Sequence, residues 1–225
     1  MLEAVVALTA LSHLLFAAQP HRVLSGLPLG FAALGIGWSC GWLPPSVYPL
    51  RAVSASAFGL DVARLVLTVD ALQFGVHWLT HRCMLSAHAQ HHVHRAPSAG
   101  DAFRTGALDG LMQLIAPIWV ALWMWRPSRL ATSAFGVAYG LWLQWIHSDD
   151  PAALARRSEW FVTPAHHRVH HQYPRTNYGH VLRVWDRACG TDRSPPRAAS
   201  SYGPKAHTTH ALPRPRADER VGGAA

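Results

Sequence analysis

Long apolar stretches separated by short polar ones make up most of the chain. Residues 1–18 are apolar apart from Glu3 and His13, and they lack the basic start of a secretory signal, so they predict a first membrane helix. Residues 23–42 are uncharged, and at about 1.5 Å per residue they are long enough to span a hydrocarbon core of about 30 Å. Pro44 and Pro45 are expected to end this second helix.

Residues 53–82 form one helical pattern without proline, longer than a membrane span needs. Its far end, which carries His77 and His81, is therefore expected to project from the bilayer. Asp61 and Arg64 lie three positions apart in this segment, so they are expected to face each other.

Two further apolar runs, 111–125 and 130–146, are marginal in length for full spans and predict a hairpin. A hairpin returns the chain to the side it left. The polar loop at 81–105 and everything after His147 are thus predicted on the same face of the membrane.

Composition agrees with a membrane protein, because only 14% of residues are charged, where a soluble domain carries roughly a quarter. The predicted fold is all-α, an integral membrane helical bundle of about four to five membrane segments with a histidine-rich helical cap on one face. We expect N-terminal membrane helices in residues 1–52, a histidine-box catalytic domain in 53–191 and a disordered basic tail in 192–225.

The formal charge of +8 does not indicate nucleic-acid binding, because several basic residues lie in the tail rather than in a stripe with aromatic residues. Cys40, Cys83 and Cys189 follow no ligand spacing, so any metal must be held by histidine. Five tryptophans near the ends of the hairpin runs favour an interfacial aromatic belt over stacking on a substrate. They are Trp119, Trp123, Trp125, Trp142 and Trp145.

Histidine carries the candidate chemistry, since 12 of the 16 histidines fall between positions 77 and 180. Three clusters have helical spacing, in which residues three and four apart share a helix face. The clusters are His77 and His81; His88, His91 and His92; and His167, His170 and His171. His147 follows the last apolar run on the predicted side of the clusters and is a further candidate ligand, the alternative being an interfacial histidine.

Neutral imidazole suits zinc, copper, iron and nickel and disfavours calcium and magnesium. Eight or nine such ligands are too many for one ion and imply two, each with four or five ligands. Two redox metals suit oxygen chemistry. A non-redox zinc-binding membrane protein or hydrolase is the alternative, and a metal transporter is a third, although its ligands would be expected midway along the helices.

The remaining histidines are weaker candidates. His166 competes with His167 for the ligand role, because it also lies four residues before His170. His94 and His180 are undecided between ligand and bystander. We expect no metal role for a last set of four, namely His13, His21, His207 and His210.

The order and spacing of these motifs resemble the fatty acid hydroxylase and sterol desaturase superfamily of membrane di-iron enzymes. The first matching stretch holds Asp70, His77, Trp78, His81 and Arg82. The second is the HxxHH box at 88–92, followed by Arg104, Thr105 and Gly106. The third runs from Thr163 and Pro164 through the HxxHH box at 167–171 to Asn177-Tyr178-Gly179 and Trp185-Asp186-Arg187, ending at Gly190-Thr191.

This resemblance implies a four-helix membrane bundle capped by two iron ions (Fe2+/Fe3+), with O2 as co-substrate. It implies a lipid substrate, fatty acyl or sterol-like, that is hydroxylated or desaturated. The electrons would come from an external donor, a reductase with a cytochrome or ferredoxin type carrier. We expect the histidine clusters on the cytoplasmic face.

Three further residues have expected supporting roles. Asp70 lies seven residues before His77, on the same helix face, and could orient an imidazole, the alternative being a polar residue at the end of a span. Asn177 and Asp186 are expected to fix the turn after the third box.

The chain departs from the family pattern at a few positions. Arg175 replaces the usual acid two residues before Asn177, Gln73-Phe74-Gly75 replaces the usual aromatic residue near the first box, and His94 and His180 are additional. These departures bear on the substrate rather than on the predicted ligands.

Overall fold

The computed structural model describes residues 35–196, and these residues are mainly helical. The membrane helix predicted at 1–18, the first part of the one predicted at 23–42 and the tail beyond residue 196 lie outside the described residues. Residues 35–39 are helical, at the end of the second predicted segment. Residues 35–196 contain no β-strand, only an isolated bridge between Phe161 and Leu182.

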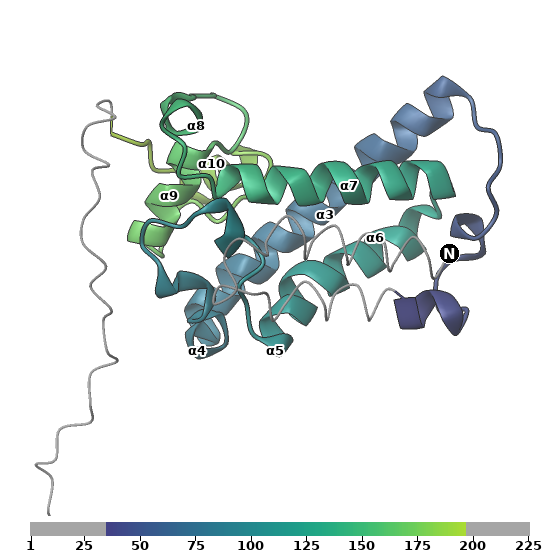
Figure 1. Cartoon of the computed structure of the whole chain (residues 1–225), viewed down its shortest axis with the longest axis horizontal. Helices are drawn as coiled ribbons and strands as arrows, with labels where there is room; N and C mark the ends of the chain where they lie inside the picture. The colour runs from purple at the N-terminus through teal and green to yellow at the C-terminus, as the bar shows by residue number, and fades with distance from the viewer. Residues whose placement is uncertain (1–34, 197–225) are drawn as a thin grey trace, which may run out of the picture.

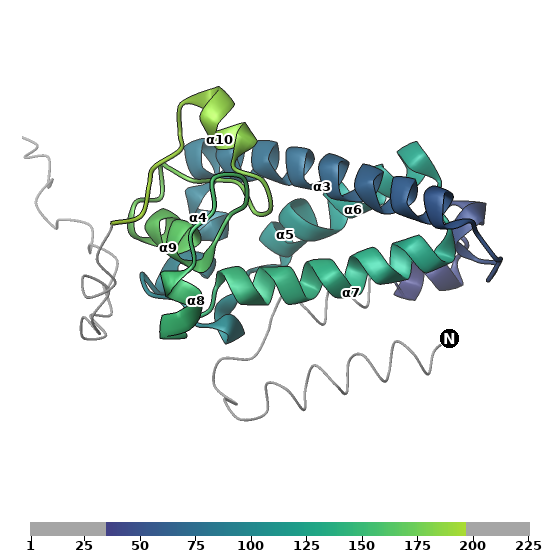
Figure 2. The same cartoon turned by 90° about the horizontal axis from the view of Figure 1, so that it is seen from above.

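Three long helical segments pack side by side and form the body of the molecule (Figures 1 and 2). Helix α3 spans Ala55–Cys83 and begins at Ser54, whose side chain accepts a hydrogen bond from the Ala57 amide. Helix α7 spans Arg129–Ile146. The segment between them is continuous and consists of α5 (Ala107–Gly110), the π-helical stretch η5 (Leu111–Ile115) and α6 (Ala116–Trp125).

Short helices and loops form a cap at one end of the body (Figure 1). The cap consists of α4 (Leu85–His88), η3 (His91–Val93), η4 (Ala99–Asp101), α8 (Pro151–Ala155), α9 (Pro164–Gln172) and α10 (Val184–Cys189). One short helix, η2 (Pro45–Val47), precedes α3. Because α3 and α7 both run toward the cap and α5–α6 runs away from it, one end of every long segment reaches the cap.

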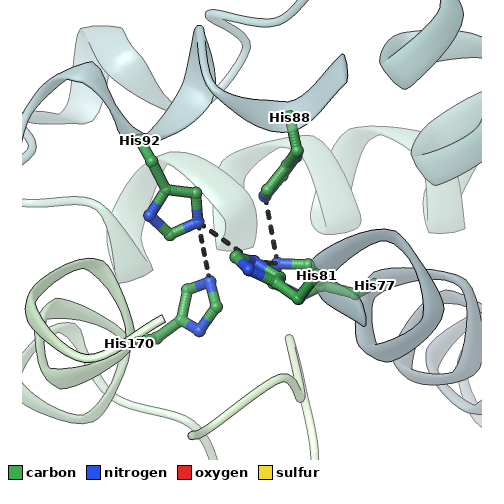
Figure 3. Close-up of side chains that lie close together, drawn as sticks. All are labelled: His77, His81, His88, His92 and His170. Carbon is green, nitrogen blue, oxygen red and sulfur yellow. Dashed lines mark hydrogen bonds between the residues drawn. The ribbon is translucent and has the colours of Figure 1, made fainter. Parts of the chain in front are cut away.

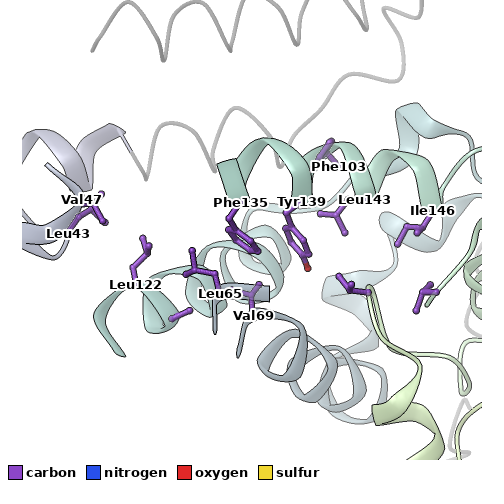
Figure 4. Packing of buried hydrophobic residues seen from close by; sticks show 13 residues of the cluster. Leu43, Val47, Leu65, Val69, Phe103, Leu122, Phe135, Tyr139, Leu143 and Ile146 are labelled. Carbon is purple, nitrogen blue, oxygen red and sulfur yellow. The ribbon is translucent and has the colours of Figure 1, made fainter. Parts of the chain in front are cut away.

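Apolar side chains fill the space between the long segments (Figure 4). Leu65 and Val69 of α3 pack with Leu122 of α6 and with Phe135 and Leu143 of α7 in one buried cluster. Burial of each such side chain contributes about 1.5–3 kcal/mol. This cluster therefore fixes the long segments relative to one another, and with them the ends that reach the cap.

The outward sides of the same helices are also apolar. Large side chains exposed by 46–59% are Leu60, Leu67, Val120, Met124, Val137 and Leu141. Among residues 35–196, one helix, Ala107–Trp125, is long and apolar enough by length and composition to cross a membrane. The expected total of four to five membrane segments stays a prediction.

The predicted hairpin forms, but the predicted pair in α3 does not. Arg126 adopts a left-handed conformation with φ of 46° between α6 and α7. Asp61 accepts a hydrogen bond of 2.8 Å from the Ser128 amide in this turn, and Arg64 stacks over Trp125. Both side chains thus reach the α6–α7 connection, but each has its own partner there, and no ion pair joins Asp61 to Arg64.

Candidate metal centre

The nine histidines predicted as ligands converge inside the cap. Their ring nitrogens form two groups, and within each group one nitrogen per residue lies within 4.8 Å of all the others. The first group, shown in Figure 3, consists of His77, His81, His88, His92 and His170. The second group consists of His91, His147, His167 and His171. Segments almost a hundred residues apart in the sequence thus meet at one place.

Both HxxHH boxes are divided between the two groups. In α9, His170 belongs to the first group, while His167 and His171 belong to the second. The spacing of the box at 88–92 predicted a single α-helix, and this prediction is wrong. Helix α4 ends at His88 and the 3-10 helix η3 begins at His91, so that His91 turns toward the second group.

Hydrogen bonds fix which ring nitrogen carries the proton. In five of the rings Nδ1 faces a backbone carbonyl, which only accepts, so Nδ1 must be the protonated nitrogen and Nε2 the bare one. The pairs are His77 with Tyr178 at 2.8 Å, His91 with Arg104 at 3.3 Å, His147 with Leu143 at 2.7 Å, His170 with Thr176 at 2.7 Å and His171 with His94 at 3.1 Å. In a sixth ring, His88, Nδ1 donates to the Asp109 carboxylate at 2.7 Å.

The bare nitrogens then point at one another. The Nε2 atoms of His91 and His147 are 3.2 Å apart, although neither carries a proton to donate. The Nε2 atoms of His77 and His88 face each other at the same separation, 3.2 Å. Two lone pairs at this distance repel unless a cation lies between them. Since five nitrogens converge in one group and four in the other, a metal ion with several coordination positions fits each group better than a proton does.

Burial keeps these rings in the neutral form that binds metals. Burial, helped by the neighbouring His91, lowers the pKa of His81 from its ordinary value of 6.5 to about 4. Burial and the adjacent His147 place the pKa of His167 well below its ordinary value. A neutral imidazole offers its lone pair to a cation, whereas a protonated one does not.

Asp109 is a functional residue that sequence reasoning missed. Besides the His88 ring, its Oδ2 atom accepts a short hydrogen bond from the Thr105 hydroxyl. The carboxylate is buried, with 2% of its residue surface exposed. The available signal was an acid at the point where the polar loop passes into the apolar run of 111–125.

Asp70, the predicted orienter, bonds elsewhere. Its carboxylate accepts hydrogen bonds from the Val181 amide at 2.8 Å, the Leu182 amide at 3.0 Å and the Trp185 indole at 2.8 Å. Asp70 therefore anchors the loop before α10 to α3 and does not contact an imidazole. Asp109 has the orienting contact with a ligand ring instead.

The turn after α9 is built as the sequence predicted. Asn177 adopts a left-handed conformation with φ of 58°, and its side-chain nitrogen Nδ2 donates to the His166 and Arg193 carbonyls. Asp186 accepts hydrogen bonds of 2.8 Å from the amides of Tyr178 and Gly179. A Cβ atom at Gly179 would lie 2.7 Å from the Leu182 carbonyl oxygen, so the position requires glycine.

The remaining described histidines lie outside the two groups. His166 contacts Asp192 at 3.0 Å, and His167 rather than His166 belongs to the second group. His94 contacts Asp101 at 3.0 Å. His180 is buried, its ring centroid is 4.8 Å from that of His77, and burial lowers its pKa to about 3. His13, His21, His207 and His210 lie outside the described residues.

Comparison with known proteins gives a consistent family signal. The family model described as fatty acid hydroxylase matches residues 62–191. The alternative squalene epoxidase of Phaeodactylum tricornutum is 30% identical over 181 residues, which are 76% of this chain and 51% of that protein. The Delta(7)-sterol 5(6)-desaturase of Leptosphaeria maculans is 28% identical over 140 residues, 60% of this chain and 38% of that protein.

A third relative, from Danio rerio, is cholesterol 25-hydroxylase-like protein 1, member 2. It is 30% identical over 159 residues, 67% of this chain and 56% of that protein. The chain thus spans about half the length of the curated relatives it matches. No solved structure gives a significant match. The match to the family model contains every residue of the two histidine groups.

Proposed function

The chain belongs to the fatty acid hydroxylase family, and on this premise we propose that it is a membrane-bound di-iron oxygenase that hydroxylates or desaturates a sterol-like lipid. The observation that carries the proposal is the convergence of nine imidazoles, seven of them buried and two partly buried, into two adjacent groups. In this proposal His77, His81, His88, His92 and His170 hold one ion, and His91, His147, His167 and His171 hold the other. Two iron ions would supply activation of O2 with two external electrons for attack on a C–H bond.

The number of imidazoles is the reason to favour iron. Each group offers four or five ring nitrogens that lie within 4.8 Å of one another, more than the three protein ligands of a catalytic zinc site. Two such groups beside each other suit a pair of redox ions. A non-redox zinc protein or hydrolase remains the second candidate, since zinc also accepts imidazole ligands.

The chain's own residues would orient the ligands and exclude water. Asp109 and the five carbonyls hold a proton on Nδ1 of six of the nine rings, so that the Nε2 lone pairs of these six would be directed at the ions. Seven of the nine rings are buried in the cap and two are partly buried, so the surrounding side chains keep most water away from them.

Two observations support a lipid substrate and a membrane location. The long helices have apolar side chains on their outer surfaces, and Ala107–Trp125 is long enough to span a bilayer. The names of the three relatives refer to squalene, a sterol and cholesterol. We therefore favour a sterol-like substrate over a fatty acyl chain. We also infer that the cap faces the cytoplasm, where a reductase with a cytochrome or ferredoxin type carrier would supply electrons.

Metal analysis and lipid comparison test the proposal. Protein purified without added zinc should contain two iron ions per chain, and His147→Ala should lower the content by one, because His147 belongs to the second group alone. His94→Ala, outside both groups, is the matched control and should retain both ions. Cells that express the protein should contain a sterol species with one more oxygen or two fewer hydrogens. Zinc in the purified protein, together with inertness toward O2 under reductant, would support the second candidate instead.

A further inference from the structure

Four exposed arginines flank residues of the histidine centre, and we call them the arginine face. Arg82 directly follows His81, Arg95 directly follows His94, Arg175 lies in the turn after α9, and Arg193 is hydrogen-bonded to Asn177 in that turn. Arg193 stacks over the Tyr173 ring at 3.8 Å from its centroid, and it also exchanges backbone hydrogen bonds with the Asn177 side chain. Within residues 35–196, no carboxylate lies within ion-pair distance of these four guanidinium groups. Among the described residues, the face thus carries four positive charges without an ion-pair partner.

Residues next to two of these arginines accept hydrogen bonds from both histidine groups. The His170 ring of the first group donates to the Thr176 carbonyl, and Thr176 directly follows Arg175. The His171 ring of the second group donates to the His94 carbonyl, and His94 directly precedes Arg95. Because His170 and His171 are adjacent in α9, Arg95 and Arg175 lie near the same turn of that helix. One hydrogen bond and a short length of backbone separate each group from an exposed arginine.

Tyr178 makes a third connection. Its ring centroid lies 5.4 Å from that of His81 and 5.7 Å from those of His77 and His170. Tyr178 lies three residues after Arg175 in the turn that follows α9, so a ring that contacts three histidines of the first group belongs to the same turn as an exposed arginine.

We propose that the arginine face docks an acidic one-electron carrier protein, which passes electrons to the metal centre through the His170–Thr176 and His171–His94 hydrogen bonds. Each transfer oxidises the carrier by one electron and reduces one metal ion by one electron. The proposal rests on the proposed function, which requires an external electron donor. Anionic lipid headgroups would also favour arginine, but they would not account for the direct connections from this surface to ligands of both groups.

Charge reversal at the face provides the test. The probe is the soluble haem domain of an acidic cytochrome b5, and the variant is Arg95→Glu with Arg175→Glu. The matched control, Arg51→Glu with Arg126→Glu, makes the same charge change at exposed arginines before α3 and in the α6–α7 turn, far from the cap. The variant should slow association of the probe about 10-fold or more at low salt and flatten its salt dependence, because rim charges steer encounter. The control should stay within about twofold of the unmodified protein.

Further measurements separate the possible failures. The milder pair Arg95→Gln with Arg175→Gln should give an intermediate rate, which guards against a glutamate that disturbs the fold. Reduction of the metal centre by dithionite should be equally fast in all proteins, whereas reduction by the probe should be slow in the variant alone. Equal association rates for variant and control would overturn the docking proposal. The docking proposal would also be overturned if the variant bound phosphatidylserine vesicles more weakly but associated with the probe at the rate of the unmodified protein. Unmodified protein that holds no reducible metal would instead refute the proposed function, because association of the probe is measured independently.

Discussion

The Asp109 carboxylate shows how a single contact can influence one imidazole of the candidate metal centre. Asp109 accepts a hydrogen bond from Nδ1 of His88, whereas the other five fixed rings donate to backbone carbonyls. A charged acceptor forms a stronger hydrogen bond than a neutral one and makes the imidazole a more basic ligand. His88 is therefore expected to depend on its supporting contact more than the other ligands do.

Replacement of Asp109 should weaken metal binding without removing a ligand. Asp109→Asn keeps an oxygen that can accept from His88 but loses the negative charge, and we expect metal affinity to fall about 10- to 100-fold. Competition with a chelator measures the change. Asp101→Asn is the control, because Asp101 contacts His94 outside both groups. Equal affinities in the two variants would show that Asp109 does not tune its ligand.

The nine histidines could be found from sequence, whereas the groups that orient them could not. Spacings such as that of His77 and His81 are visible without a structure, because helical periodicity is local. The acceptors of Nδ1 are mostly backbone carbonyls distant in sequence, such as Tyr178 for His77. Any residue has a carbonyl, so its identity gives no signal. Asp70 was misjudged for the same reason, since its partners are backbone amides more than a hundred residues away.

At the scale of elements, α9 contributes more of the nine converging histidines than any other described element. It supplies His167, His170 and His171 within nine residues, and it begins at Thr163, whose hydroxyl accepts from the His166 amide. So short a helix has little intrinsic stability. The N-cap hydrogen bond of Thr163 and the packing of α9 must therefore hold the three rings in place.

Loss of this cap should affect stability and metal affinity together. Thr163→Ala removes the acceptor at the start of α9, and we expect a loss of about 1 kcal/mol in the free energy of unfolding, together with weaker metal binding. Thermal unfolding and chelator competition measure the two effects. Ser54→Ala removes the corresponding N-cap hydrogen bond of α3, at the end of that helix far from the histidine groups. It should therefore lower stability but leave metal affinity unchanged. Unchanged metal affinity in Thr163→Ala would mean that packing alone positions α9.

The long elements were predictable, and the irregular ones were not. The run 53–82 corresponds to α3 at Ala55–Cys83, and the run 130–146 to α7 at Arg129–Ile146, because apolar length without proline is a strong helix signal. The π-helical stretch Leu111–Ile115 and the change from α4 to η3 depend on tertiary contacts, and no local pattern marks them.

At the scale of the whole molecule, burial of the histidines makes folding depend on pH. The pKa of His81 is lowered to about 4 and that of His180 to about 3, while both regain a value near 6.5 when the chain unfolds. Between these values the unfolded chain binds more protons than the folded one. Stability is therefore highest above about pH 6.5 and decreases as the pH falls toward 4.

The metal-free protein in detergent should show this dependence directly. We expect its unfolding temperature to be nearly constant between pH 7.5 and 8.5 and to fall steadily between pH 6.5 and 5. Differential scanning calorimetry across this range measures it. Metal-loaded protein should unfold at a higher temperature throughout, because the ions bind the folded state. An unfolding temperature that stays level down to pH 5 would contradict the low pKa values.

Shared ions also change what a break in the backbone would do. Asp149 and Asp150 are exposed in the link between α7 and α8, and six of the nine rings precede this point while three follow it. If the peptide chain were cleaved at this link, each ion would be coordinated by histidines from both fragments. A protein cleaved at this link would therefore stay one particle, because both fragments would bind the same two ions.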